Sequence, residues 1–316
     1  MKRIIAVLLS LVLLAGALSA CGAKTPAAGG GDGKLSVVAT IYPAYDFARA
    51  VAGDKAQLTM LLPPGSEIHS YEPTPQDIIK IQNCDVFIYN GGESDEWVDD
   101  VLSSIKNDMT VVRMTDCVTQ VTEETKEGMY VHEEAEEGDE PEYDEHVWTS
   151  PVNAEKISAA IEKALAAKDP ENAPAFQSNQ SAFAAKLENL DGQFKDIVSH
   201  SKRKTLVFAD RFPVRYFTEE YGLDYFAAYP GCAEDSEPSA RTVSYLINKV
   251  KEENIPYVLY IEFSNEKMAD TVCEDTGCGK LLFHSCHNIT KSDFENGVTY
   301  LDIMSENLET VRKALN

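Results

Sequence analysis

Short apolar runs alternate with polar, helix-forming stretches along most of the chain. The runs are rich in β-branched residues, and each is followed by sequence that favours a helix. This is the pattern of parallel strands joined by crossover helices. The runs fall into two sets, "KLSVVATI", "AQLTMLL", "DVFIYN" and "TVVRM", then "KTLVFA", "DYFAAY", "YVLYIEF" and "KLLFHS". We therefore predict an α/β fold of two similar lobes with mainly parallel sheets.

A long segment with helical periodicity separates the two sets. At 1.5 Å per residue a single helix here would be about 40 Å long, enough to contact both lobes. We predict an N-terminal lobe over 35–168, a rigid connecting helix over 169–202 and a C-terminal lobe over 203–316. The apolar positions at helical spacing are Phe176, Phe183, Leu187, Leu190, Phe194 and Ile197.

The N-terminus has the pattern of an export signal. Lys2 and Arg3 precede an apolar run over 4–18 that is too short for a transmembrane helix and ends in small residues before Cys21. Because "LSAC" resembles the lipobox of bacterial lipoproteins, we predict removal of the signal peptide 1–20 and acylation of Cys21. An ordinary secretory signal is the other interpretation. The Gly-rich segment 21–34 then forms a flexible tether, and the lipid holds the protein at the outer face of the cytoplasmic membrane.

Acidic residues strongly outnumber basic ones. The chain has 52 Asp and Glu against 28 Lys and Arg, a formal charge of −24. Nucleic acid is excluded as a partner, because phosphate binding needs clustered basic side chains. A divalent cation suits this charge, although acidity also simply keeps an exported protein soluble. An acidic loop at about 122–145 either gathers cations or is a solvated segment without a metal role.

Four side chains at predicted strand ends or helix starts are candidate metal ligands. His69 lies between a strand and a helix, His146 just before a helix, and Asp210 and His284 each at the end of a strand. Open α/β sheets bind ligands at this carboxyl edge, so two residues from each lobe would meet in the cleft between the lobes. Three imidazoles and one carboxylate suit zinc, whereas manganese prefers more oxygen.

Three segments of the sequence resemble the zinc/manganese solute-binding lipoproteins of metal-uptake ABC transporters, in the zinc-uptake type of cluster A-I. The resemblance extends from about residue 35 to the C-terminus. It implies two α/β lobes joined by a long rigid helix, with one ion held between them by four side chains. The segments are "GSEIHSYEPTPQDIIKIQNCDVFIYNGGESDEWV", "DEHVWTSPVNAEKI" and "VFADRFPVRYFTEEYGLDY".

The resemblance also suggests which residues hold the ion. His69 and His146 match the family's first two ligands directly. The third ligand falls on Asp210 if a one-residue insertion is allowed, and otherwise on Arg211, which cannot bind a cation. The fourth falls on His284. Two alternates stay open in the C-terminal lobe, because His287 follows in the same loop as His284 and Glu262 could replace Asp210.

The function implied is high-affinity binding of a divalent transition metal, zinc first and manganese as the alternative, and its delivery to an ABC transporter permease by a monomeric protein that is not an enzyme. A surface zinc metallohydrolase is a second hypothesis, but no H-E-x-x-H motif occurs. A metal-stabilised adhesion lipoprotein is a third.

Overall fold

The computed structural model describes residues 33–130, 142–231 and 239–316. The predicted signal peptide 1–20, Cys21, most of the tether 21–34 and the middle of the acidic loop lie outside the described residues. The two ends of that loop pair with each other, since Glu123 N donates to Glu142 O at 2.8 Å and Asp144 N to Val121 O at 2.9 Å. Among the described helices, none is long and apolar enough to cross a membrane.

The N-terminal lobe is built on a four-stranded parallel sheet of order β2-β1-β3-β4. Side chains alternate between its two faces, so Val37 packs toward α2 and α5 while Val38 packs toward α3 and α4. The strands are β1 (Leu35–Ala39), β2 (Ala56–Met60), β3 (Val86–Tyr89) and β4 (Thr110–Arg113). The helices are α2 (Tyr42–Ala52), α3 (Pro75–Gln82), α4 (Trp97–Ser104) and α5 (Pro151–Lys168), with 3-10 turns η1 (Glu93–Asp95), η2 (Thr115–Cys117) and η3 (Val147–Thr149).

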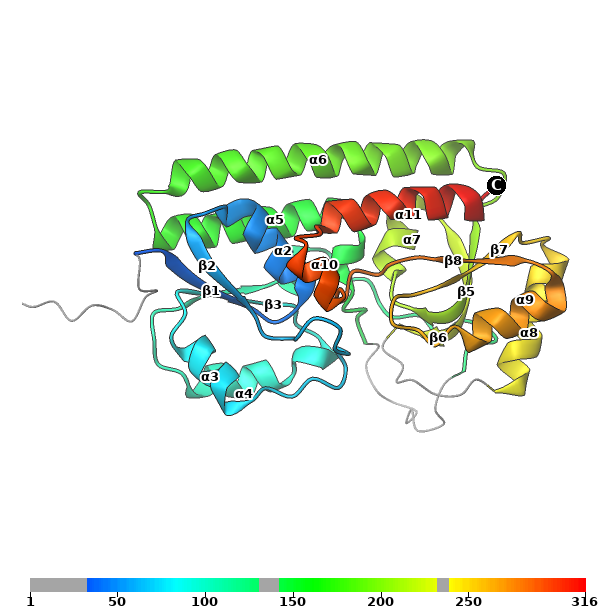
Figure 1. Cartoon of the computed structure of the whole chain (residues 1–316), viewed down its shortest axis with the longest axis horizontal. Coiled ribbons are helices and arrows are strands. Elements are labelled where there is room, and N and C mark those ends of the chain that lie inside the picture. Colours follow the sequence, from blue (N-terminus) through cyan, green and yellow to red (C-terminus); the bar gives the residue numbers. More distant parts are fainter. Residues whose placement is uncertain (1–32, 131–141, 232–238) are drawn as a thin grey trace, which may run out of the picture.

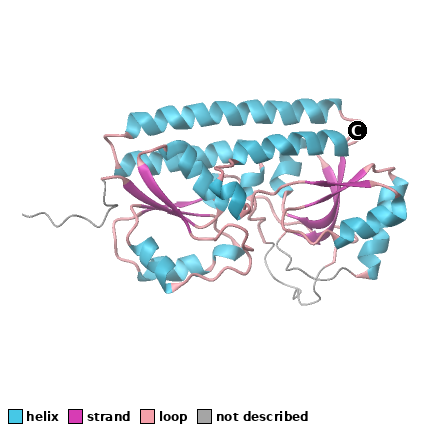
Figure 2. Ribbon diagram, viewed as in Figure 1, coloured by secondary structure: helices cyan, strands magenta, loops and turns pink. Residues whose placement is uncertain are grey.

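The C-terminal lobe repeats this design with a parallel sheet of order β6-β5-β7-β8. One face packs on α8 and α9, and the other faces the helices shared with the first lobe. Its strands are β5 (Thr205–Phe212), β6 (Asp224–Pro230), β7 (Tyr257–Tyr260) and β8 (Gly279–Leu282), and its helices are α7 (Arg215–Tyr221), α8 (Ala240–Glu252), α9 (Lys267–Thr276) and α10 (Lys291–Glu295). Two α/β lobes with parallel sheets confirm the predicted fold class (Figure 2).

Helix α6 (Ala173–His200) runs along one side of both lobes (Figure 1). Its 28 residues make it about 42 Å long. The six apolar positions singled out in the sequence are all buried, against α5 at one end and α7 and α11 (Tyr300–Ala314) at the other. The helix begins at Ala173, inside the predicted range 169–202, because α5 ends at Lys168 and a short turn follows.

The chain also returns from the C-terminal lobe to the N-terminal lobe. After β8, the Asn288 amide donates to the carbonyls of Pro63 and Ser66 at 2.8 and 2.9 Å. Farther on, Tyr300 N donates to the buried Asp46 carboxylate at 2.8 Å. The chain therefore spans the two lobes both through α6 and through this return segment. We expect small loop movements rather than a wide hinge opening.

Candidate metal centre

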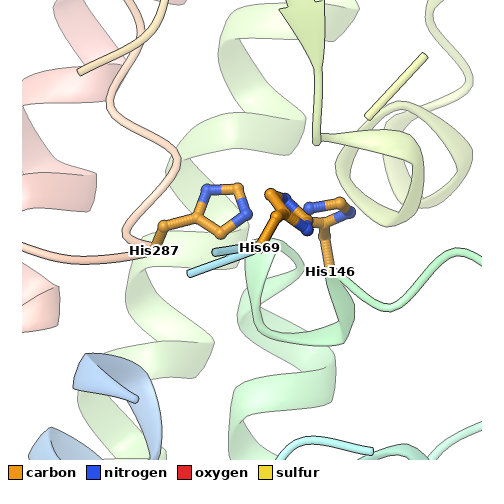
Figure 3. A group of neighbouring side chains, drawn as sticks. All are labelled: His69, His146 and His287. Carbon is orange, nitrogen blue, oxygen red and sulfur yellow. The ribbon is translucent and has the colours of Figure 1, made fainter. Parts of the chain in front are cut away.

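Three histidine rings converge between the lobes (Figure 3). His69 lies in the loop between β2 and α3, His146 directly before η3, and His287 in the loop after β8. One ring nitrogen of each lies within 4.8 Å of the others. The ring centroids of His146 and His287 are 4.6 Å apart, and that of His69 is 5.8 Å from His287 and 6.1 Å from His146. This spacing can place one ion in contact with all three rings.

Hydrogen bonds to Nδ1 fix the tautomer of His69. Its Nδ1 lies 2.9 Å from Ser94 Oγ, and the Ser94 hydroxyl in turn donates to the Glu145 carboxylate. Because the only hydrogen of that hydroxyl is used on Glu145, the serine oxygen accepts from the ring, so Nδ1 carries the proton. Nε2 is left with a lone pair, which is the state that a metal needs.

The same arrangement holds His287 in the other lobe. His287 Nδ1 lies 2.5 Å from Ser285 Oγ, whose hydroxyl donates to Glu262 Oε1 at 2.6 Å. His146 uses a carboxylate directly, with Nδ1 3.1 Å from Asp144 Oδ1. All three rings are therefore oriented through Nδ1 and leave Nε2 as the donor atom.

The three Nε2 atoms are buried and have no hydrogen-bond partner among the described residues. An unmatched polar atom in a buried position costs free energy, and here three such atoms of one kind meet at one point. A divalent cation bound by three nitrogens would satisfy all three lone pairs. This is the observation that distinguishes the cluster from an ordinary group of core histidines.

The protonation of the three rings differs. Burial, followed by the charges of His146 and Arg211, lowers the pKa of His69 to about 4. Burial, followed by the charges of His146 and His69, puts the pKa of His287 well below its usual range. Burial also acts to lower the pKa of His146, but the carboxylates of Asp144, Glu145 and Glu123 together raise it above its usual value. His146 is thus the ring at which a proton competes with the ion.

We accordingly expect zinc affinity to fall by about tenfold for each pH unit below the raised pKa of His146, because one proton is exchanged for the ion. His69, with a pKa lowered to about 4, and His287, with a pKa well below its usual range, are already neutral there and add nothing to this slope. Chelator-competition titrations between pH 5 and 8 measure this slope. A slope near pH 6 that corresponds to about three protons exchanged per zinc ion would contradict the assignment of the competing proton to His146 alone.

Asp210, the predicted third ligand, lies outside this cluster. Its carboxylate accepts hydrogen bonds from the backbone N–H of Arg211 at 2.8 Å and of Ile261 at 3.2 Å. It therefore ties the end of β5 to the end of β7, and burial raises its pKa. These two hydrogen bonds tie the Asp210 carboxylate to the backbone, and Asp210 is not one of the three residues whose donor atoms converge in the described structure.

His284, the predicted fourth ligand, also lies outside the cluster, and the alternate His287 takes the place expected for it. His284 Nδ1 accepts the Cys286 N–H at 3.0 Å. In the neutral ring Nε2 then carries the proton, so neither nitrogen offers a lone pair. Cys286 has a left-handed φ of 65°, and this turn directs His287 toward the other two rings.

Glu262, the other alternate, supports the loop instead of joining the three donors. Its two oxygens accept from Ser285 N at 2.7 Å, Ser285 Oγ at 2.6 Å and His287 N at 3.1 Å. The sequence reasoning did not identify Ser94, Glu145 or Ser285. A signal was available for two of them, because Glu145 directly precedes His146 and Ser285 lies between His284 and His287.

A family model described as zinc-uptake complex component A, periplasmic, matches residues 37–314. The chain belongs to this family. The zinc-binding lipoprotein AdcA of Streptococcus pneumoniae is 33% identical over 315 residues, which cover 99% of this chain and 61% of AdcA. The chain thus spans about three fifths of the length of that relative. The high-affinity zinc uptake system protein ZnuA of Bacillus subtilis is 30% identical over 301 residues, covering 94% of this chain and 93% of ZnuA.

The zinc-uptake component A fold is also seen in solved structures. The Zn(II)-bound ZnuA-like domain of Streptococcus pneumoniae AdcA superposes with a TM-score of 0.75 at 30% identity, and the match covers 90% of this chain and 99% of that domain. The two-lobed fold of this chain is therefore shared with that Zn(II)-bound domain.

Proposed function

We propose that this protein binds one zinc ion outside the cytoplasmic membrane and delivers it to the permease of an ABC transporter. The observation that supports this best is the meeting of three buried Nε2 lone pairs from two lobes, at His69, His146 and His287. Each ring is held by a carboxylate, directly or through a serine, as in proteins that bind zinc through histidine. Manganese is the alternative cargo, but an all-nitrogen donor set favours zinc.

The surroundings of the cluster favour binding over hydrolysis. A zinc hydrolase needs a carboxylate that faces the metal-bound water as a general base. Here Glu145 and Glu262 bond the serines behind the rings, and Asp144 bonds His146 on the side away from the cluster. We therefore do not assign an enzymatic activity to the site.

The proposed location rests on the N-terminal sequence. We infer that Cys21 carries lipid and anchors a monomeric protein to the outer face of the membrane, where its metal site can meet a permease. The relatives from Streptococcus pneumoniae include a protein named as a lipoprotein, which supports this anchor.

Metal analysis of the purified protein tests the proposed function. We expect one zinc per chain after dialysis, displacement of manganese by equimolar zinc, and loss of the ion in the His69→Ala variant. The exposed His200 on α6, replaced by alanine, serves as the matched control and should keep its zinc. Absence of stoichiometric metal from the unaltered protein would contradict the proposal.

A further inference from the structure

Arg211 occupies an unusual position for a cation, beside a site that is built to bind one. It lies near the end of β5 with only 7% of its surface exposed. Its neighbour in sequence, Phe212, lies close to the cluster: a Cβ added to Gly231 would be 3.0 Å from both the Phe212 carbonyl oxygen and His146 Cε1. After burial and the neighbouring rings, the Arg211 charge also lowers the pKa values of His69 and His287.

The guanidinium is held by an ion pair across the two lobes. Arg211 Nη2 lies 3.2 Å from Glu67 Oε2, and Glu67 is two residues before His69. The other Glu67 oxygen accepts the Ile68 N–H at 3.0 Å. Arg211 is therefore tied to the loop that carries His69.

The cluster supplies three donors, whereas a closed zinc site has four. The carboxylates around it are already used: those of Asp144, Glu145 and Glu262 orient the rings, and that of Asp210 holds the backbone. Glu67 bonds Arg211 and its own loop. Within the described ranges, three nitrogens thus converge on one point, and the loop that supplies the His69 nitrogen also pairs with a buried guanidinium.

We propose that the fourth zinc ligand is a small carboxylate-type anion from solution, with one oxygen on the ion and the other on Arg211. The proposal rests on the zinc-binding function proposed above. A guanidinium presents N–H donors in a planar fork that matches a carboxylate, which a lysine or a histidine does not. An anion at this place would also lie between the ion and the guanidinium, and its negative charge would be favourable to both. Zinc and anion would then bind together.

Zinc affinity measured against anion concentration tests this. The full chain, purified in detergent, is titrated with zinc by chelator competition while acetate or bicarbonate replaces perchlorate at constant ionic strength. We expect a saturable tightening of at least about tenfold, the size of one charge-assisted hydrogen bond. Cobalt(II) in place of zinc should show a saturable shift of its visible absorption bands under the same conditions.

Three variants separate the role of Arg211 from a general effect of charge. In Arg211→Gln, zinc affinity should no longer depend on the anion. Arg211→His should bind zinc tightly without any added anion, because it supplies a fourth imidazole. Arg215→Gln is the matched control, since Arg215 is also mostly buried in the same lobe but pairs with Glu219 and Glu124. Arg215→Gln should show the same anion dependence as the unaltered protein. Anions also bind free zinc in solution, but this effect is equal in all samples and cancels in the comparison.

The rival ligands give different results. If Glu67 leaves Arg211 to bind the ion, affinity is independent of added anion and falls in Glu67→Gln, which overturns the proposal. If water is the fourth ligand, zinc affinity is independent of the anion in the unaltered protein as well as in Arg211→Gln. This result would also overturn the proposal. Tight zinc binding with no anion effect would leave the proposed uptake function intact, whereas no zinc binding under any condition would defeat that function itself.

Discussion

Replacing His287 with alanine is expected to weaken zinc binding by about a few hundredfold. Structural zinc sites with four ligands bind with about 10–16 kcal/mol in total, so one ligand accounts for about 2.5–4 kcal/mol. The loss should be specific to the ion, because His287 Nε2 makes no hydrogen bond within the described structure. Chelator-competition titration of the purified variant measures the change, and thermal unfolding without metal reports any general damage.

His284→Ala is the matched control, since both histidines lie in the same loop after β8. The His284 ring accepts one backbone N–H and contributes no donor to the cluster. We expect its zinc affinity to stay within about threefold of the unaltered protein, with some loss of loop stability because the Cys286 N–H is left without its partner. A large loss in His284→Ala with little effect in His287→Ala would reverse the assignment of this ligand.

The fold was predictable because its strands and its long helix carry strong, local patterns. The four residues of β3 are all buried, as are most of those of β5, and buried parallel strands read as continuous apolar runs. In α6 the buried side chains recur at helical spacing. The return of the chain after β8 to the N-terminal lobe had no such signal, because it depends on a few hydrogen bonds such as those of Asn288.

The N-terminal half of the site was predictable for a similar reason. His69 and His146 lie shortly before helices whose starts are visible in the sequence, with Thr74 and Ser150 as caps. The C-terminal half depends on backbone geometry. A left-handed turn at a cysteine is not expected from residue type, yet such a turn at Cys286 separates the two histidines, and only His287 joins the cluster. Asp210 has the right chemistry and strand position, but its oxygens are used by backbone N–H groups.

The serines behind the rings carry the second large prediction. Ser94→Ala and Ser285→Ala are each expected to weaken zinc binding by about 10- to 100-fold, the range seen when groups that orient zinc-bound histidines are removed. Each variant deletes the hydroxyl that holds an Nδ1–H and connects it to a carboxylate. The ring is then free to take the other tautomer, in which Nε2 carries the proton and cannot bind the ion.

Ser158→Ala is the control that separates a specific effect on zinc binding from the general effect of removing a buried serine hydroxyl. Ser158 is fully buried in α5 and its hydroxyl donates to the Glu155 carbonyl, so the substitution removes a buried serine without touching the cluster. All three variants should show a similar, small loss of thermal stability, but only Ser94→Ala and Ser285→Ala should lose zinc affinity. Because one serine belongs to each lobe, comparable losses would show that both lobes prepare their histidine in the same way. Unchanged affinity in Ser285→Ala would mean that packing alone fixes His287, and the carboxylate behind it would then have no part in holding the metal.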